Sequence, residues 1–311
     1  MKRLKVVFMG TPEFCLPLLK MIIDCYTCVG VVTQPDKEVG RKREIVFSPV
    51  KKLALEHNVT VLQPQNIKKE YEGVISLKPD IIITCAYGQI VPEQILNYPK
   101  YGCINVHASL LPSLRGGAPI HKAIIYGLKE TGITIMYMDK GMDTGDMISK
   151  EKVTISDDDT AQSLHDKLKD LAVPLLKKTI TQIIEGTSNR IPQDNRKVTY
   201  AYNVSREDEH VSFDKSSKDV YNQIRGLNSW PGAYAILDDK PVKLWASKIS
   251  CENGDKEPGT IIKLDKDGML VKTADGSVLI TELQMPGKKK TLVKDFINGS
   301  KKEDFVGKRF S

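Results

Sequence analysis

The stretch Leu4-Lys5-Val6-Val7-Phe8-Met9, followed by the turn Gly10-Thr11-Pro12, decides the fold of the N-terminal half of the chain. It is a short apolar run of the kind found in strands that are buried on both faces, and a helical pattern starts directly after it, near Glu13. Similar runs recur at 29–33, 80–85 and 103–107, with further helical patterns starting near Ser48, Ile67 and Pro119. This alternation predicts a parallel sheet with helices on both faces.

The remainder of this first, Rossmann-like α/β domain follows from two more runs and a long helix. Residues 133–138 and 147–153 extend the sheet, and a helix opens at Thr160 with leucines at helical spacing. Pro174 lies inside this helix and is expected to kink or end it. Because residues 189–206 are polar, we predict a first domain over 1–188 and a linker over 189–206.

Residues 207–311 predict a second, smaller domain of a different kind. After one short helix at 218–225, strand-like runs lie at 242–249, 260–264, 269–273 and 278–283. Pairs such as Asp267-Gly268 and Asp275-Gly276 separate the runs, and such pairs suit the tight turns of hairpins. The pattern predicts a small antiparallel β-barrel that is similar to oligonucleotide-binding (OB) barrels.

The composition excludes several classes of protein. A share of 41% hydrophobic and 27% charged residues in 311 indicates a folded chain, not a disordered or fibrous one. The apolar run at 4–9 is far shorter than the roughly 20 residues of a membrane span, so we expect a cytoplasmic protein without membrane contact. Six cysteines are too few for a disulfide scaffold, and Cys25 and Cys28 have no second pair to complete a zinc site, so no metal is expected.

The turn after the first strand argues against a nicotinamide cofactor. A dinucleotide-binding fold places the motif GxGxxG at this turn, because its second glycine lets the backbone approach the pyrophosphate. Only Gly10 fits that motif here, and Pro12 stands where the second glycine would be. A dehydrogenase is therefore the weakest of the functional hypotheses.

Asn105 and His107 end one of the predicted strands and are the first candidates for chemistry. Side chains two residues apart on a strand point to the same face, and ligands of open α/β sheets bind at the carboxyl ends of strands. Asp143 lies in Gly141-Met142-Asp143-Thr144-Gly145, where the glycines allow a tight loop that could aim its carboxylate into the same site. The loop after His107 contains Ser109-Leu110-Leu111-Pro112 and Arg115-Gly116-Gly117-Ala118-Pro119.

These motifs resemble the family of formyltransferases that use 10-formyltetrahydrofolate. The resemblance rests on Asn105, His107 and Asp143 together with the SLLP and RGGAP runs. VVFMGTPEF at 6–14, VVTQPDKEVGRKR at 31–43, QPQNIK at 63–68 and LNSWPGA at 227–233 look like the branch that acts on methionyl-tRNA. The resemblance implies transfer of a formyl group from 10-formyltetrahydrofolate to the amino group of methionyl-tRNA, which makes the formylmethionyl initiator tRNA of translation.

The resemblance also implies which residues bind the two substrates. The folate would lie on Ser109, Leu110, Leu111 and Pro112 and on Gln89, Ile90 and Val91. A monomer would bind the initiator methionyl-tRNA through Arg41, Lys42 and Arg43 after the second strand and through Lys288, Lys289 and Lys290 in the barrel. The net charge of +7 is compatible with such a partner, because lysine and arginine neutralise phosphates.

The chemistry assigns roles and leaves one alternative open. Asn105 and a protonated His107 could stabilise the oxyanion that forms when an amine attacks the formyl carbon. Asp143 could orient His107 and keep it protonated, or it could take a proton from the amine through water.

Other functions also remain open. Formyltransferases acting on a sugar nucleotide or on glycinamide ribonucleotide would keep Asn105, His107 and Asp143. They would not explain the basic loop that contains Arg41, Lys42 and Arg43. A formyltetrahydrofolate hydrolase is a further alternative, as is a nucleic-acid-binding protein whose first domain is catalytically dead.

Overall fold

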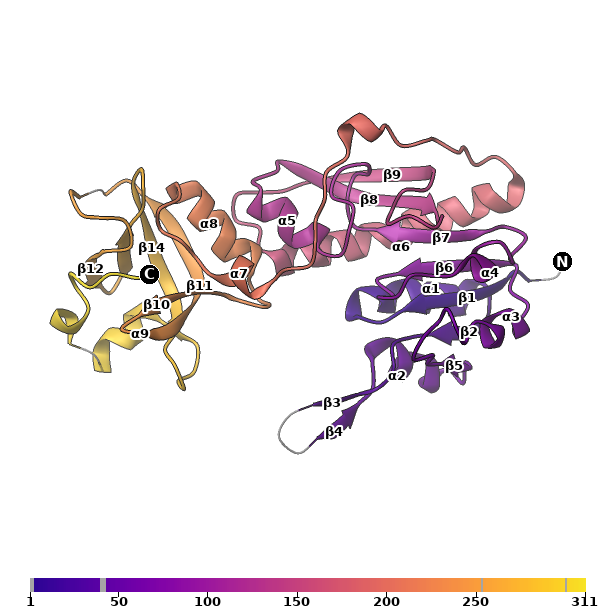
Figure 1. The fold of residues 1–311 in the computed structure, drawn as a ribbon, viewed down its shortest axis with the longest axis horizontal. Coiled ribbons are helices and arrows are strands. Elements are labelled where there is room, and N and C mark those ends of the chain that lie inside the picture. The colour runs from indigo at the N-terminus through magenta and orange to yellow at the C-terminus, as the bar shows by residue number, and fades with distance from the viewer. Residues whose placement is uncertain (1–2, 40–42, 253, 300) are drawn as a thin grey trace. The chain divides into compact units, whose positions relative to one another are not determined.

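The computed structural model describes residues 3–39, 43–252, 254–299 and 301–311, which form two compact units (Figure 1). The first unit comprises Met1–Pro119, Thr131–Val153 and His165–Tyr202. The second comprises Ile120–Glu130, Thr154–Leu164 and Asn203–Ser311. Each unit has its own sheet and its own hydrophobic core.

The first unit is built on a seven-stranded sheet in the order β5-β2-β1-β6-β7-β8-β9. The predicted strands are all present. They are β1 Lys5–Gly10, β2 Thr27–Val32, β6 Ile81–Cys85, β7 Cys103–His107, β8 Glu130–Tyr137 and β9 Met147–Thr154, and the sheet has one more strand that was not predicted, β5 Val61–Leu62. Strands β5, β2, β1, β6 and β7 run parallel, so the carboxyl ends of β6 and β7 meet at one edge of the sheet.

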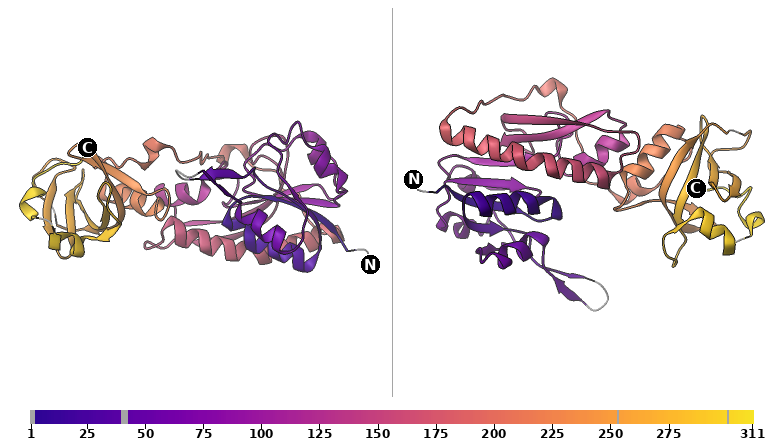
Figure 2. Two further views of the ribbon diagram at one scale, coloured as in Figure 1. Left: turned by 90° about the horizontal axis from the view of Figure 1, so that it is seen from below. Right: turned by 180° about the vertical axis from the view of Figure 1, so that it is seen from behind.

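Helices cover both faces of this sheet, as the strand pattern predicts. Figure 2 shows α1, Leu16–Cys25, and α6, Ala161–Glu185, on one face. On the other face Val74 of α3, Glu72–Ser76, and Ile95 of α4, Glu93–Leu96, share a core cluster with alternate residues of β1. The remaining short elements are η1 Glu13–Cys15, α2 Pro49–Glu56 and η2 Asn195–Lys197.

The direction of strand β8 differs from the prediction of a parallel sheet. β8 pairs with β7 in antiparallel register, and Thr134 lies opposite His107. The intervening helix α5, Pro119–Ile125, has seven residues and rises only about 10 Å, which is shorter than the roughly 17 Å of β7. The chain therefore re-enters the sheet at the edge that it left, and the sheet is mixed.

Two further details depart from the local sequence pattern. Helix α6 does not end at Pro174 but continues to Glu185, because a stripe that includes Leu168, Leu176 and Ile180 stays buried along its length. Residues around the basic loop form a short hairpin of β3, Lys37–Val39, and β4, Glu44–Val46. The pattern gave no sign of these strands because β4 is exposed along its length.

The second unit is an antiparallel barrel, which confirms the predicted class. Its strands follow the order β10-β11-β14-β13-β12, and β15 adds to β14. The bounds are β10 Ala233–Leu237, β11 Lys240–Ser250, β12 Ile261–Asp265, β13 Gly268–Lys272, β14 Ser277–Gln284 and β15 Thr291–Leu292. The helical elements are α7 Arg206–Glu209, α8 Ser217–Gly226, α9 Val293–Phe296, η3 Ile297–Gly299 and η4 Lys302–Asp304.

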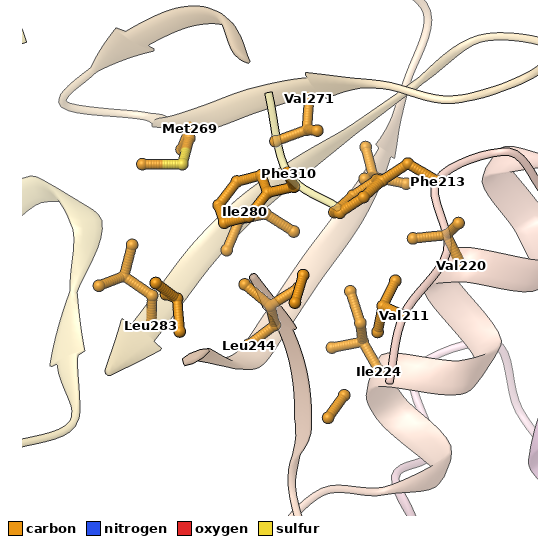
Figure 3. Packing of buried hydrophobic residues seen from close by; sticks show 14 of the residues in the cluster. Val211, Phe213, Val220, Ile224, Leu244, Met269, Val271, Ile280, Leu283 and Phe310 are labelled. Atoms are coloured by element: carbon orange, nitrogen blue, oxygen red, sulfur yellow. The ribbon is translucent and has the colours of Figure 1, made fainter. Parts of the chain in front are cut away.

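Residues 307–311 close the barrel by pairing with both of its edges. On one side the Ile261 N–H donates to Lys308 O at 2.8 Å. On the other side Ile236 and Ser311 exchange two backbone hydrogen bonds of 2.8 and 2.9 Å. Figure 3 shows Phe310 reaching from this segment into the core, where its ring stacks on Phe213 with the centroids 5.5 Å apart.

A buried ion pair fixes α5 to α7 within the second unit. Lys122 Nζ lies 2.8 Å from Asp208 Oδ1, and the Lys122 side chain is only 8% exposed. Burial works to raise the pKa of Asp208, but the hydrogen bonds from Lys122 and from the Ser205 N–H outweigh it and hold that pKa below its ordinary value. Asp208 is therefore ionised at neutral pH and matches the buried ammonium.

We expect Asp208→Asn to lower the free energy of unfolding by about 1 to 3 kcal/mol at pH 7, because it leaves the Lys122 ammonium buried without a carboxylate. Solvent screens the 35% exposed carboxylate, which keeps the loss below that of a fully buried pair. Stability from a lowered carboxyl pKa is present above the unfolded pKa of about 3.9 and is lost as the pH falls through the folded value. The difference between wild type and variant should therefore shrink below about pH 4.

Urea titration followed by tryptophan fluorescence measures this loss, because both tryptophans, Trp230 and Trp245, lie in the second unit. Asp238→Asn is the matched control, since Asp238 pairs with Lys308 on the barrel surface with both side chains exposed. The control should change the free energy of unfolding by less than about 0.5 kcal/mol. Equal losses in the two variants would contradict the prediction.

No helix among the described residues is long and apolar enough to cross a membrane.

Candidate active site at the carboxyl ends of strands β6 and β7

The register of β6 and β7 places Thr84 directly opposite Asn105. Thr84 Oγ1 donates to Asn105 Oδ1 at 2.8 Å, and together with the carboxylate of Asp143 on the other side, which only accepts, this fixes which end of the amide is which. The two N–H groups on Asn105 Nδ2 then face away from Thr84, toward Asp143. The sheet therefore holds the amide of Asn105 as a donor at its edge.

His107 is buried and held by the loop that follows its strand. Its side chain is 6% exposed, and Nε2 lies 2.9 Å from the carbonyl oxygen of Leu114. A carbonyl only accepts hydrogen bonds, so Nε2 carries the proton. The other ring nitrogen, Nδ1, faces Asp143 Oδ2 at 3.6 Å, which is an ion-pair distance when the ring holds a second proton.

Asp143 completes the cluster from the loop between β8 and β9. Its backbone has a φ of 55°, and Gly145 beside it has no room for a side chain because a Cβ would lie 2.0 Å from Tyr137 O. The carboxylate Oδ1 lies 3.5 Å from Asn105 Nδ2, and Oδ2 accepts from the Gly116 N–H at 2.8 Å. The predicted tight loop thus aims the carboxylate, which is 17% exposed, between Asn105 and His107.

The cluster brings together donors, an acceptor and partial access to solvent. The Asn105 amide presents N–H groups, His107 can carry positive charge, and Asp143 can accept a proton or hold one on His107. Such an arrangement suits a reaction in which negative charge develops on an oxygen while a proton leaves a nucleophile. The structure brings the three predicted residues into one place.

Gln193 joins the two loops of the site through all of its amide hydrogen-bonding groups. Nε2 donates to Asp143 O and to Gly145 O, both at 2.8 Å. Oε1 accepts from Arg115 Nε at 3.0 Å and from Arg115 Nη2 at 2.7 Å. Gln193 belongs to the predicted linker, residues 189–206. We call the part of it that lies in the first unit, residues 189–202, the strap.

The strap is hydrogen bonded along the loop that follows β7. The Leu114 N–H donates to Thr199 Oγ1, and Arg115 exchanges backbone hydrogen bonds with Thr199 and Ala201. Gly116 has a φ of 117°, and a Cβ there would lie 2.7 Å from Ala201 O, so this close approach requires glycine. The strap therefore forms one wall of the candidate site.

Sequence reasoning missed Thr84, Gln193 and the roles of Leu114 and Arg115. Thr84 left a weak signal, since it is a polar residue at the end of an otherwise apolar strand. Gln193 left none, because a glutamine in a polar stretch resembles any linker residue. The Leu114 carbonyl acts through the backbone, which no side-chain pattern reveals.

We expect Gln193→Ala to lower kcat about 10- to 100-fold, because the Asp143 loop loses two hydrogen bonds and a displacement near 1 Å costs on that order. Gln193→Glu should be similarly impaired, since it still accepts from Arg115 but has no N–H for the two carbonyls. KM for each substrate should stay within about twofold. Steady-state kinetics against each substrate measures both parameters.

Asn195→Ala is the matched control for Gln193, because Asn195 is an exposed residue of the same strap. This variant should keep the wild-type kcat. Wild-type turnover in Gln193→Ala would show that the loops hold their geometry without the bridge. Circular dichroism and thermal melting of each variant would separate a local effect from loss of the fold.

The residues expected to bind folate lie in two places. Ser109–Pro112 directly follow β7 and pack against β8: Ser109 donates to Ser113 O, and Thr134 Oγ1 lies between Ser109 O and the Leu111 N–H. Gln89 bonds Pro64 O and the Ile67 N–H, Ile90 is exposed and Val91 is buried in the core. Ile90 is therefore the exposed member of its group, and in the other group Leu110 and Pro112 are partly exposed while Ser109 and Leu111 are buried.

A hollow of about 430 Å³ opens beside Gln89 and Ile90. Its other lining residues come from the segment after β2 and from the QPQNIK motif: Gln34, Gln65, Asn66, Ile67 and Lys68. Its lining includes Gln89 and Ile90 but none of Asn105, His107 and Asp143. Amide side chains dominate the lining, so the hollow offers both donors and acceptors to a heterocyclic ring.

The predicted tRNA-binding residues are only partly visible. Arg41 and Lys42 lie outside the described residues. Arg43 follows them at the start of β4, where its side chain is 82% exposed and Nε lies 3.8 Å from Glu38 Oε2. Lys288, Lys289 and Lys290 are exposed residues of the second unit, and Lys290 pairs with Glu282 at 2.9 Å.

Cys85 directly follows Thr84 at the end of β6, and a cysteine thiol next to an active site can act as a nucleophile. Its interaction with the neighbouring Cys15 thiol and its burial hold the pKa of the Cys85 thiol well above its usual range. The thiol is therefore protonated at neutral pH and is a poor nucleophile. Within the described ranges, no group of three or more His, Cys, Asp or Glu side chains is placed to hold a metal ion.

Two family models match the chain. Residues 4–180 match the family described as formyl transferase, and residues 203–301 match the formyl transferase C-terminal domain. Because these matches cover most of the sequence, the chain belongs to the formyl transferase family.

Individual relatives point to one branch of that family. The methionyl-tRNA formyltransferase of Halalkalibacterium halodurans is 50% identical over 309 residues, which is 98% of this chain and 97% of the relative. The methionyl-tRNA formyltransferase of Bacillus subtilis is 49% identical over 300 residues, 95% of each chain. A crystal structure of a sugar 3N-formyl transferase, 21% identical with a TM-score of 0.66, covers 92% of this chain and 99% of its own and shows the shared fold.

Proposed function

We propose that this chain is an enzyme that transfers the formyl group of 10-formyltetrahydrofolate to the amino group of initiator methionyl-tRNA. The observation that carries the proposal is the cluster of Asn105, His107 and Asp143 in a chain about 50% identical over nearly its full length to methionyl-tRNA formyltransferases. The product would be the formylmethionyl initiator tRNA of translation, and we place the reaction in the cytoplasm.

In this reaction the amine of methionine attacks the formyl carbon, and the carbonyl oxygen becomes an oxyanion. The Asn105 Nδ2 groups, whose direction Thr84 fixes, would donate to that oxyanion, and a protonated His107 would add positive charge. The new carbon–nitrogen bond forms on the amine, the bond to N10 of the folate breaks, and the proton that leaves the amine balances the one that N10 takes up.

Asp143 would handle charge and protons in one of two ways. It would either hold the second proton on His107 Nδ1, which it faces at 3.6 Å, or accept the proton of the amine through water. Its Oδ2 already accepts from the Gly116 N–H, so Oδ1, near Asn105, is the oxygen better placed for a transferred proton. Both roles require an ionised Asp143 at the start of the reaction.

The residues assigned to folate suit such a ligand. The 430 Å³ hollow beside Gln89 and Ile90 offers amide donors and acceptors to the edge of a heterocycle, and exposed Ile90 offers an apolar contact. Ser109, Leu110, Leu111 and Pro112 would form the side of the folate site nearest to His107. Val91 would act only by supporting Ile90, because its own side chain is buried.

The tRNA would be bound through phosphates. We assign this contact to Arg41, Lys42 and Arg43 of the first unit and to the exposed Lys288, Lys289 and Lys290 of the second. We further propose that residues 1–188 are the catalytic domain, that the linker 189–206 completes its site through the strap, that residues 207–311 are the tRNA-binding domain, and that the protein acts as a monomer. Because phosphate contacts release counterions, rising salt should raise KM for tRNA steeply.

The test is transfer of labelled formyl from 10-formyltetrahydrofolate to four acceptors in parallel: methionyl-tRNA, free methionine, glycinamide ribonucleotide and an amino-sugar nucleotide. We expect label on methionyl-tRNA alone. Label on a small acceptor would replace the tRNA assignment with one of the other formyltransferase activities. Absence of transfer to all four would contradict the enzymatic function.

A further inference from the structure

Two stacked tyrosines stand on the outer side of the strap, beside the candidate site. The rings of Tyr200 and Tyr202 are 5.5 Å apart between centroids and 4° from parallel. Tyr200 is 44% exposed and Tyr202 is 63% exposed, whereas Ala201 between them is fully buried. The two rings together present a continuous aromatic face to solvent, and burying such a face against a ligand is favourable.

Side chains alternate between the two sides of the strap, and this explains why both tyrosine rings face outward. Ala201 packs toward the loop after β7, where its backbone bonds Arg115 and Ala118. In an extended segment successive side chains point to opposite sides, so Tyr200 and Tyr202 share the side away from that loop. The same contacts that form the wall of the site therefore present the tyrosine pair.

The backbone of the tyrosine pair is linked to Asp143 through Arg115 and Gly116. Tyr200 forms a β-bridge with Arg115, and the next residue, Gly116, donates its N–H to Asp143 Oδ2 at 2.8 Å. The backbone that carries Tyr200 is therefore paired with the same short segment that holds the Asp143 carboxylate. The strap also carries the exposed cations Arg190, Arg196 and Lys197. Arg196 and Lys197 share one acid, Asp194, and Arg190 lies 4.0 Å from Asp146.

We propose that Tyr200 and Tyr202 form a stacking platform for the unpaired 3′-terminal base of the tRNA substrate. This inference rests on the proposed function, in which the reacting amine is joined to the terminal ribose through the amino acid alone. When the amine lies at Asp143, the terminal base must lie nearby and needs a surface. Aromatic rings supply one to an unpaired base of any identity, and the cations of the strap suit its phosphate.

The test uses the full-length enzyme and two methionylated acceptor-stem RNA hairpins, one with the intact 3′-terminal base and one abasic at that nucleotide. With the intact RNA, Tyr202→Ala should raise KM about tenfold, as expected for loss of one stacked base, while kcat and KM for the formyl donor stay within about twofold. Tyr202→Phe keeps the ring and should behave as wild type. Tyr98→Ala, which removes an exposed tyrosine elsewhere in the first unit, is the matched control and should have no effect.

The abasic RNA separates stacking from a merely structural role of the ring. It should cost the wild-type enzyme about tenfold in KM and cost Tyr202→Ala almost nothing more, since the same contact is lost once. Equal costs of Tyr202→Ala with both RNAs, or an unchanged KM, would overturn the platform while formylation by the wild type still stands. If the wild type formylates neither RNA and no methionyl-tRNA, it is the proposed function that fails.

Discussion

Asp143→Asn is expected to lower kcat for formyl transfer by about 10²- to 10⁴-fold, the range of a lost general base or of a lost partner that keeps a histidine charged. Asparagine tolerates the φ of 55° that Asp143 adopts, so the loop should keep its shape. The neutral amide cannot hold a second proton on His107 or take one from the amine. Single-turnover rates with preformed enzyme–tRNA complex would measure the chemical step directly.

A double variant would decide between the two roles of Asp143. If Asp143 acts through His107, then His107→Ala with Asp143→Asn should be no slower than the slower single variant, because the pair is lost as one unit. If Asp143 is an independent base, the two losses should multiply. Turnover near that of the wild type in Asp143→Asn would remove the residue from the mechanism, and unchanged KM for both substrates would show that binding survived.

Asn105→Ala is expected to lower kcat by about 10²- to 10³-fold, the usual cost of removing one oxyanion-hole donor. KM should change little, since the oxyanion exists only along the reaction. Thr84→Val is a milder variant for comparison, because it keeps the Asn105 amide but removes the hydroxyl that helps to fix the orientation of that amide. We expect about tenfold from Thr84→Val, which rapid-quench measurement of labelled product would resolve from the larger loss.

Two outcomes would contradict the role of Asn105. A rise in KM with unchanged kcat would mean that the amide holds substrate equally before and during the reaction. A Thr84→Val variant as slow as Asn105→Ala would mean that the hydroxyl does more than orient the amide. Thermal melting of Asn105→Ala should stay close to wild type, because Asn105 is only partly buried.

The sequence predicted those parts of the fold that rest on local patterns. The apolar run at 4–9 and its repeats identified the strands, and Asn105 and His107 could be placed on one face because their spacing of two is a local property. The prediction of a wholly parallel sheet was wrong at β8, which runs antiparallel to β7. The direction of β8 depends on whether α5 is long enough to return the chain to the opposite edge of the sheet, and the apolar pattern of the strands does not record this. The hairpin of β3 and β4 was missed because exposed strands lack an apolar pattern.

The candidate site divides in the same way. Asp143 could be proposed because its flanking glycines indicate a tight loop, and the structure indeed brings it to Asn105 and His107. Gln193 could not, because its partners lie 78 and 50 residues away and its bonds include backbone carbonyls. Interactions of that range depend on the assembled fold, and one sequence carries no record of them.

The strap has a consequence for how such a protein can be divided or recombined. A fragment ending at residue 188 would keep every strand of the first sheet and all three candidate residues, yet it would lack Gln193 and the backbone of 199–201. We therefore expect a chimaera joined at residue 188 to fold but to be inactive, whereas a junction after Tyr202 would carry the chemistry to a new partner domain. In an evolutionary exchange of substrate-binding domains, the inherited module would be the sheet together with its strap.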